Sequence, residues 1–259
     1  MRRLLSALGT MALLACTAGP PVNAPLLPPQ RSGFADMGAA IQAMQRDDLA
    51  NPAMLWLQDG RQLWGQAPTA QSKACVSCHG EPVRLRGVAT RYPAWDEALQ
   101  RPVNLGTRIN LCRQRHQGQT PWPPEHQDLL ALETLVALQS RGMPITPAID
   151  PRLAPFRERG AALFQQRIGQ LDLSCATCHD RLAGGRLGGI TIPQGQATGY
   201  PLYRLEWQSM GSLARRIRNC MTGVRAEALP AHGVEMAELE LHLAARALGM
   251  VLETPAVRP

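Results

Sequence analysis

Two short cysteine and histidine motifs carry the clearest chemistry in this sequence. They read Cys75-Val-Ser-Cys78-His79 and Cys175-Ala-Thr-Cys178-His179. Two thiols three residues apart on one helical turn can add to the vinyl groups of a porphyrin, and the adjacent imidazole can ligate its iron. The sequence therefore predicts two covalently bound haem c groups, with His79 and His179 as iron ligands.

The same residue types allow two other interpretations. Two Cys pairs could form a zinc site, and the cysteines of an exported protein could pair as disulfides. Zinc sites rarely place a His directly after the second Cys of both pairs, and the repeated spacing is unexpected by chance. Haem attachment is therefore the favoured interpretation.

Two further cysteines could ligate the second face of each iron. Cys112 and Cys220 precede the last helical segment of their half of the chain, where small c-type cytochromes place a distal ligand, whereas Met143 and Met250 follow that segment. We therefore favour Cys112 and Cys220 as metal ligands, with a disulfide between them as the alternative. A thiolate is a soft anionic ligand that stabilises ferric iron and lowers the potential.

An arginine accompanies the second of these cysteines. If the segment from Ser212 is helical, Arg216 lies on the same face as Cys220, where a cation favours thiolate and attracts a small dianion. Arg108 holds the same place relative to Cys112. Arg216 is thus either a substrate-binding residue or a structural one, for example a partner of a haem propionate.

The elements that must position these residues repeat along the chain. Gly60 precedes Cys75 by the same interval as Gly160 precedes Cys175. Apolar residues at helical spacing predict helices over 129–139 and 236–248, each followed by Gly-Met, and strand signals are sparse. The predicted fold class is mainly α, with two tandem cytochrome c-like modules, each built around one covalently attached haem. The predicted modules are 33–143 and 156–259, joined by a Pro-rich linker at 144–155.

The first residues have the pattern of an export signal. Arg2 and Arg3 precede an apolar stretch from Leu4 to Ala15, which is too short to span a bilayer. We interpret 1–15 as a signal peptide and 16–32 as a Pro-rich leader or tether. The residues before Cys16 resemble a lipobox, so Cys16 could carry a lipid anchor, and cleavage nearby is the alternative. Either way the chain is expected in the periplasm.

Composition narrows the function classes further. Aromatic residues make up only 4% of the chain, so a non-protein group such as a porphyrin could fill part of each core. The formal net charge is +7, yet Lys73 is the only lysine and the arginines are scattered. No segment combines clustered cations with aromatic residues, which argues against nucleic-acid binding.

The C-terminal half resembles the SoxA family, the dihaem subunits of SoxAX cytochromes. The resemblance covers nearly all of the chain after the signal peptide and is most specific in Gly199 to Arg204, Leu213 to Cys220 and Glu240 to Thr254. It implies a periplasmic heterodimer with the monohaem cytochrome SoxX. It also implies an enzyme, an L-cysteine S-thiosulfotransferase that joins thiosulfate oxidatively to a cysteine of the carrier SoxYZ.

The resemblance also implies roles for individual residues. Cys220 would be both haem ligand and catalytic sulfur, and Arg216 would bind the substrate anion. The haem on Cys175, Cys178 and His179 would accept electrons first, before SoxX and a cytochrome acceptor, whereas the other haem has no assigned task.

Three other functions fit parts of the pattern. A dihaem thiosulfate dehydrogenase that forms tetrathionate would also use a Cys-ligated haem but would need no carrier. A dihaem electron-transfer cytochrome would bind no substrate at all. A subunit that only docks the carrier would keep its affinity after haem loss.

Overall fold

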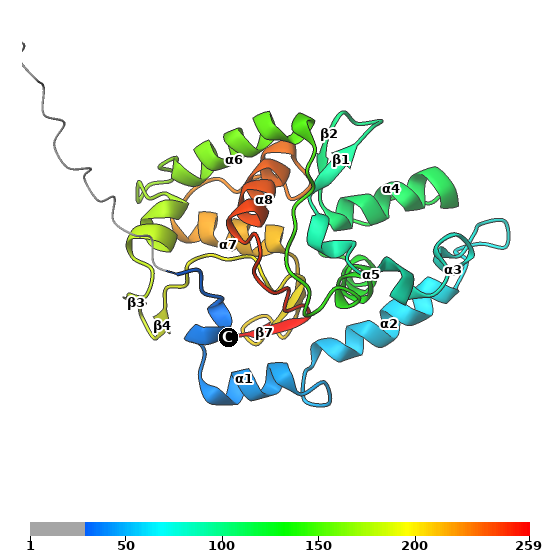
Figure 1. Cartoon of the computed structure of the whole chain (residues 1–259), viewed down its shortest axis with the longest axis horizontal. Helices are drawn as coiled ribbons and strands as arrows, with labels where there is room; N and C mark the ends of the chain where they lie inside the picture. Colours follow the sequence, from blue (N-terminus) through cyan, green and yellow to red (C-terminus); the bar gives the residue numbers. More distant parts are fainter. Residues whose placement is uncertain (1–28) are drawn as a thin grey trace, which may run out of the picture.

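The computed structural model describes residues 29–259. The predicted signal peptide, Cys16 and most of the Pro-rich leader lie outside the described residues. Figure 1 shows two groups of helices side by side, α2 to α5 in one and α6 to α8 in the other. Within residues 29–259, none of the helices combines the length and apolar character needed to cross a membrane.

The chain is mainly helical, as its sequence predicts. The α-helices are α1 (Ala39–Arg46), α2 (Ala53–Gly65), α3 (Cys75–His79), α4 (Leu105–Gln117), α5 (Gln127–Leu138), α6 (Ala154–Gln165), α7 (Leu213–Gly223) and α8 (Val234–Arg246). Short 3-10 helices occur at η1 (Gly33–Asp36), η2 (Pro82–Leu85), η3 (Ala89–Arg91) and η4 (Pro151–Leu153), and η5 (Thr177–Arg181) is a π-helical turn. The helices predicted at 129–139 and 236–248 are α5 and α8, and both predictions are confirmed.

One crossing of two helices organises each half of the chain. α2 packs on α5, and α6 packs on α8. A Cβ atom on Gly60 would lie 2.4 Å from the carbonyl oxygen of Ala131, and one on Gly160 would lie 2.0 Å from that of Glu238. Only glycine allows the two backbones to approach this closely. The repeated glycines therefore mark the two crossing points.

Short strands are more numerous than the sequence indicates. The strands are β1 (Ala94–Asp96), β2 (Arg101–Val103), β3 (Arg186–Leu187), β4 (Ile190–Thr191), β5 (Leu202–Arg204), β6 (Ser209–Gly211) and β7 (Ala256–Arg258). β1 pairs with β2, and β5 pairs antiparallel with β6 and parallel with β7. Because each strand has only two or three residues, no alternating pattern exists to reveal it. The β3–β4 hairpin lies between His179 and Tyr200, where the chain is longer than in the matching segment between His79 and Tyr92; this insert therefore has no counterpart in the first half.

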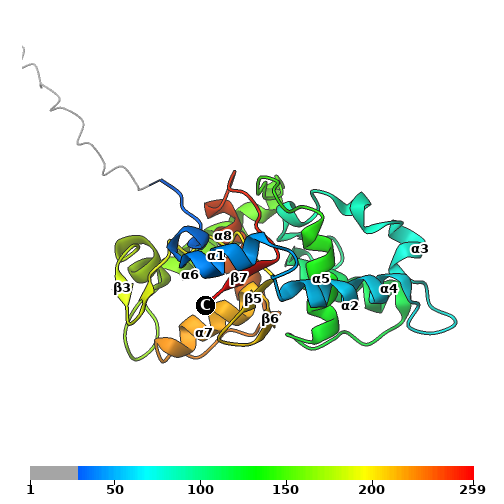
Figure 2. The same cartoon turned by 90° about the horizontal axis from the view of Figure 1, so that it is seen from below.

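The N-terminal segment packs against the C-terminal half. α1 lies beside β7 in Figure 2. The Asn51 amide donates to the carbonyl of Pro255 at 3.0 Å, and Gln45 Oε1 accepts from the backbone N–H of Val257 at 3.1 Å. These contacts join residues about two hundred positions apart in sequence. The first part of the chain thus holds β7, the last strand, in the sheet that it forms with β5 and β6.

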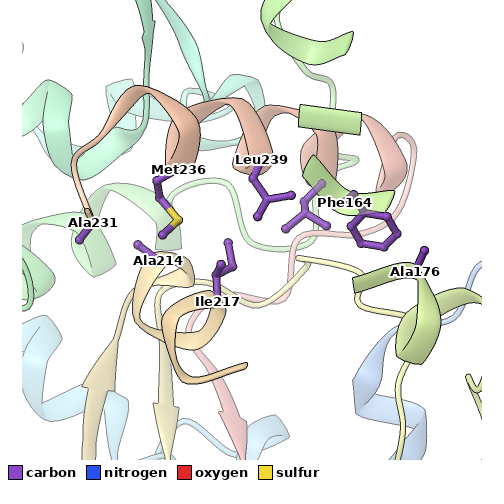
Figure 3. Packing of buried hydrophobic residues seen from close by; sticks show 8 residues of the cluster. Phe164, Ala176, Ala214, Ile217, Ala231, Met236 and Leu239 are labelled. Atoms are coloured by element: carbon purple, nitrogen blue, oxygen red, sulfur yellow. The ribbon is translucent and has the colours of Figure 1, made fainter. Parts of the chain in front are cut away.

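Apolar contacts fix α7 against the rest of the C-terminal half. Figure 3 shows Ala214 and Ile217 of α7 facing Met236 and Leu239 of α8, with Phe164 of α6 beside them. Ala214 is 3% exposed and Met236 is fully buried. This packing sets the rotation of α7 and therefore the direction in which its polar residues project.

The two halves exchange hydrogen bonds at the start of α4 and α7. Asn104 caps α4 and donates to the carboxylate of Glu240 at 2.9 Å, whereas Ser212 caps α7 and donates to the carboxylate of Glu125. A cavity of about 110 Å³ separates the halves here, and Glu133 also lines it. Burial raises the pKa of Glu133 to about 8 and that of Glu240 to about 7, and the neighbouring carboxyl groups add to both shifts.

Candidate haem centres

The first Cys-x-x-Cys-His motif forms a single helical turn. Cys75 to His79 are α3, which ends at Gly80 with a φ of 65°. The indole Nε1 of Trp64 donates to the carbonyl oxygen of Gly80 at 2.9 Å, and its ring centroid lies 5.7 Å from that of His79. α2 therefore positions the histidine through a buried tryptophan.

The second motif is held by its own hydrogen bonds. Ser174 Oγ accepts from the backbone N–H of Thr177 at 3.1 Å, and the backbone N–H of Ser174 donates to Thr177 Oγ1 at 3.1 Å. His179 Nδ1 lies 2.8 Å from the carbonyl oxygen of Pro193. A donor Nδ1 fixes the tautomer in which Nε2 is free to ligate a metal. The insert that contains Pro193 thus orients His179.

The donors of the first motif open onto an apolar cavity. Its volume is about 240 Å³, and Cys75, Cys78, His79 and Cys112 all line it. The remaining lining residues are mostly apolar or aromatic: Trp64, Ala74, Leu85, Val88, Tyr92, Leu105, Ile109, Leu132 and Val136, with Lys73, Arg108, Arg113, His116 and Gln117 as polar members. Two thiols, an imidazole and a further thiol around an apolar space are the donor set of a covalently attached haem. The residues present fit that group.

Each remaining cysteine lies in the centre of its own half. Cys112 on α4 is close enough to Cys75 and Cys78 for the charges of these thiols to affect one another, and the thiol of Cys220 on α7 is hydrogen-bonded to His179. All six described cysteines are free thiols. Cys220 and His179 are therefore neighbours in the second half, as Cys112 and Cys75 are in the first.

Neither alternative use of the cysteines is found in the described part of the chain. Cys112 and Cys220 do not form a disulfide. Over residues 29–259, no group of three or more His, Cys, Asp or Glu side chains is arranged to hold a bare metal ion. Met143 and Met250 lie where the halves meet, because Ile145 N–H donates to the carbonyl of Met250 and Leu252 N–H to that of Met143.

The two candidate distal cysteines have opposite pKa shifts. Burial raises the pKa of the Cys112 thiol; Arg108 and Arg115 oppose this, whereas Cys78 and Asp96 add to it. Burial also acts to raise the pKa of Cys220. However, the hydrogen bond to His179 and the positive charges of Arg216 and Arg204 outweigh it, so the pKa of Cys220 is lowered.

The arginines beside these cysteines have different surroundings. Arg108 donates to the carboxylate of Asp96 at 2.6 Å and to the carbonyl of Trp95 at 3.1 Å. Within the described range 29–259, Arg216 forms hydrogen bonds only through its backbone, whose N–H donates to the carbonyl of Ser212, and none with its side chain. The two arginines occupy equivalent positions, yet only Arg108 has a structural partner.

Sequence reasoning gave no role to Asp96 or to Arg204. Both follow a Tyr-Pro pair, Tyr92-Pro93 or Tyr200-Pro201, whose peptide bond is cis in both cases. An alignment of the halves through these pairs would have placed Asp96 opposite Arg204 and shown that the charge is reversed.

Comparisons with known proteins agree with this geometry. The family profile described as SoxA/TsdA, cytochrome c domain, matches residues 59–145 and 159–252. The two matched segments confirm two tandem cytochrome c-like modules in a mainly helical chain, and cytochrome c domains bind haem covalently.

Individual relatives share most of their length with this chain. The L-cysteine S-thiosulfotransferase subunit SoxA of Pseudaminobacter salicylatoxidans is 34% identical over 88% of this chain and 80% of that protein. The subunit of the same name from Paracoccus pantotrophus is 31% identical over 96% and 86%. The crystal structure of SoxXA from P. pantotrophus superposes with a TM-score of 0.85 at 32% identity, covering 89% of this chain and 87% of that one.

Proposed function

Because this chain belongs to the SoxA family of L-cysteine S-thiosulfotransferase subunits, we propose that it couples thiosulfate oxidatively to a cysteine of a SoxYZ-type carrier. The observation that carries this proposal is the Cys220 thiol, which faces His179 and has a lowered pKa beside Arg216. A thiol that ionises readily next to an unpaired cation is suited to react with a small sulfur dianion.

Two haem c groups would be held by the residues already described. Cys75 and Cys78 attach one with His79 and Cys112 as iron ligands; Cys175 and Cys178 attach the other with His179 and Cys220 as ligands. The apolar cavity around Cys75 and the hydrogen bond between His179 and Pro193 support these assignments. When bound, the haem at Cys220 supplies an acceptor for single electrons.

The overall reaction can be balanced in atoms and electrons. The carrier S–H bond breaks, an S–S bond to the outer sulfur of thiosulfate forms, and one proton and two electrons are released. The reaction would proceed in two steps, both at the Cys220 sulfur. The thiolate of Cys220 forms the S–S bond with thiosulfate as two electrons leave, and the carrier thiolate then attacks the same sulfur and displaces the Cys220 thiolate.

Arg216 would bind the substrate during both steps. Its guanidinium is fixed on the same side of α7 as Cys220 and has five N–H donors for the terminal oxygens of thiosulfate. The anion is thereby held with its outer sulfur toward Cys220 while the negative charge of the sulfonate end is neutralised. Arg216 can act on substrate because no protein acceptor within residues 29–259 already occupies it.

The partner and the compartment follow from the same family. We propose a heterodimer with a SoxX-type monohaem cytochrome, which receives the electrons and passes them to a cytochrome acceptor. The similar crystal structure is that of SoxXA from P. pantotrophus, which supports this pairing. The protein would act in the periplasm after removal of residues 1–15, with a lipid on Cys16 as an additional anchor.

A product analysis tests the proposal. The haem-loaded protein with its SoxX-type partner is mixed with thiosulfate, an oxidised cytochrome and purified SoxYZ, and each protein is analysed by mass spectrometry. We expect a thiosulfonate on the carrier cysteine and extra sulfur on the Cys220 peptide. Tetrathionate with an unmodified carrier would instead indicate a thiosulfate dehydrogenase, and an unmodified Cys220 with no product would indicate an electron-transfer cytochrome.

A further inference from the structure

The segments before α4 and α7, the helices that carry Cys112 and Cys220, are built in the same way. A cis Tyr-Pro bond begins a short hairpin, β1–β2 or β5–β6, whose turn contains a glutamine in the left-handed region, Gln100 with a φ of 50° and Gln208 with a φ of 49°. In register, Asp96 pairs with Arg101 and Arg204 pairs with Ser209. Asp96 and Arg204 therefore occupy the same place in the two hairpins.

In the first half this place holds a buried acid that binds two arginines. The Asp96 side chain is 1% exposed. It accepts from Arg108 at 2.6 Å, from Arg115 at 2.8 and 2.9 Å, and from the backbone N–H of Leu99 at 2.9 Å. Asp96 thus offsets one of the two positive charges and engages the donor groups of both arginines, so that Arg108 and Arg115 are already paired within the protein.

In the second half the same place holds a cation. Arg204 is 12% exposed, and its Nε–H donates to Glu206 Oε2 at 2.8 Å. Its two terminal NH₂ groups have no hydrogen-bond acceptor among residues 29–259. Glu206 itself is 62% exposed, so water screens most of its charge. Arg204 therefore keeps one edge of its guanidinium free and nearly buried.

Arg204 lies near the Cys220 sulfur. Arg204 and Arg216 are both neighbours of Cys220, and both also lie near the buried hydroxyl group of Tyr200. They approach from two elements, because Arg204 is on β5 and Arg216 is on α7. Within the described range the side chains of both lack a partner for their terminal NH₂ groups, whereas Arg108 and Arg115 in the other half are paired.

From these contacts we infer that Arg204 is a second substrate-binding residue, which together with Arg216 holds the oxygen atoms of a doubly charged sulfur oxyanion against Cys220. This inference rests on the proposed function and deepens it. Two guanidinium groups balance the two charges of the anion, and their planar donor edges suit the terminal oxygens of a sulfonate end. Glu206 restrains Nε and leaves the terminal NH₂ groups for the ligand.

Equilibrium binding of thiosulfate tests this role. The haem-loaded protein with its cytochrome partner is titrated with sodium thiosulfate by calorimetry, without carrier and without electron acceptor, so no turnover occurs. Loss of a charge-assisted hydrogen bond should raise the dissociation constant of Arg204→Gln roughly tenfold or more, and Arg204→Lys should recover part of the affinity. Arg157→Gln is the matched control, because Arg157 is exposed on α6 and its loss changes the net charge equally.

Two results would overturn the inference. One is an Arg204→Gln variant that binds thiosulfate as tightly as the unmodified protein. The other is a change in the haem absorption spectrum of anion-free Arg204→Gln, which would show that Arg204 serves a haem propionate. Because binding is measured without turnover, it is independent of the product analysis. If the unmodified protein failed to form the carrier conjugate but Arg204→Gln still showed the expected loss of thiosulfate affinity, only the proposed function would be contradicted.

Discussion

The helices α4 and α7, which carry Cys112 and Cys220, differ in their electrostatic surroundings more than in their shape. α4 and α7 begin with equivalent capping residues, Asn104 and Ser212, and place an arginine four residues before a half-buried cysteine. Yet the pKa of Cys112 is raised and that of Cys220 is lowered. Backbone geometry is therefore not what separates the two cysteines.

The difference lies in the hairpins that precede the helices. Asp96 pairs with both arginines beside Cys112 and offsets part of their charge, whereas Arg204 adds a further positive charge near Cys220. We propose that this one charge reversal in a repeated scaffold separates a structural role for Cys112 from a reactive role for Cys220.

The largest difference should appear when each cysteine is replaced by serine. We expect Cys220→Ser to lower the rate of carrier conjugation by roughly a thousandfold or more, because it removes the nucleophile. Cys112→Ser should lower the same rate less than about tenfold, because the nearby Arg108 and Arg115 are already paired with Asp96. Product formation is followed by mass spectrometry of the carrier.

Haem content is the control for both variants. Each should retain two covalently attached groups, since Cys75, Cys78, Cys175 and Cys178 are unchanged. Equal losses of rate in the two variants would contradict the division of roles between the two halves.

The helix crossings should be the next most sensitive positions. An alanine at Gly160 would place its Cβ 2.0 Å from a backbone oxygen, and one at Gly60 would place it 2.4 Å away, so both helix pairs must separate. We expect each substitution to lower the free energy of unfolding by about 3 kcal/mol, with the greater loss at Gly160. Guanidinium unfolding of the haem-loaded protein measures this.

Gly65 provides a matched control on the same helix as Gly60. A Cβ atom there would have no neighbour within 4 Å, so Gly65→Ala should be neutral or stabilise the protein by about 0.5 kcal/mol. If Gly60→Ala were equally harmless, the close crossing of α2 and α5 would not be required for stability.

Much of this architecture could be predicted from the sequence because its signals are local. The Cys-x-x-Cys-His turns, the apolar spacing of α5 and α8, and the helical face shared by Arg216 and Cys220 all depend on residues within a few turns. The glycines at the helix crossings repeat at a fixed interval, so they could be found by comparing the halves. The helical fold class follows from these features.

The remaining features depend on contacts between distant residues. Gln45 reaches Val257, and Asn104 reaches Glu240, and no local pattern links either pair. Strands of three residues are too short to show alternation, so the hairpins that carry Asp96 and Arg204 were missed. The partner of an arginine also depends on tertiary packing, which is why the sequence left Arg216 with two possible roles.

The carboxyl groups between the halves should make stability depend on pH. The folded pKa values of Glu240 and Glu133, about 7 and about 8, lie above the ordinary value of 4.5. The folded state therefore holds protons that the unfolded state has released, and the contribution of this pair to stability falls as pH rises from about 5 to about 8. Glu240→Gln should remove about 2 kcal/mol of this decline.

Unfolding of Glu240→Gln and unmodified protein at pH 5 and pH 8 measures this effect. The amide oxygen of the variant can still accept the hydrogen bond from Asn104. Glu235→Gln is a control on the same helix, because Glu235 is exposed in the first turn of α8. If Glu240→Gln lost as much stability between pH 5 and pH 8 as the unmodified protein does, Glu133 and Glu240 would already be ionised at neutral pH.

The smallest expected effect compares the two hairpin positions directly. Asp96→Asn removes the carboxylate that binds Arg108 and Arg115, and we expect it to lower the free energy of unfolding by about 2 kcal/mol at pH 7. The arginines hold the pKa of Asp96 well below its usual range, so this contribution is full above pH 4 and is lost only as pH falls through the lowered value. Arg204→Gln should change stability by less than about 0.5 kcal/mol, because its acidic partner is exposed to solvent. Equal losses of unfolding free energy in the two variants would mean that Arg204, like Asp96, stabilises the fold. A stable Arg204→Gln variant that binds thiosulfate weakly would instead show that the positive charge at this position binds substrate.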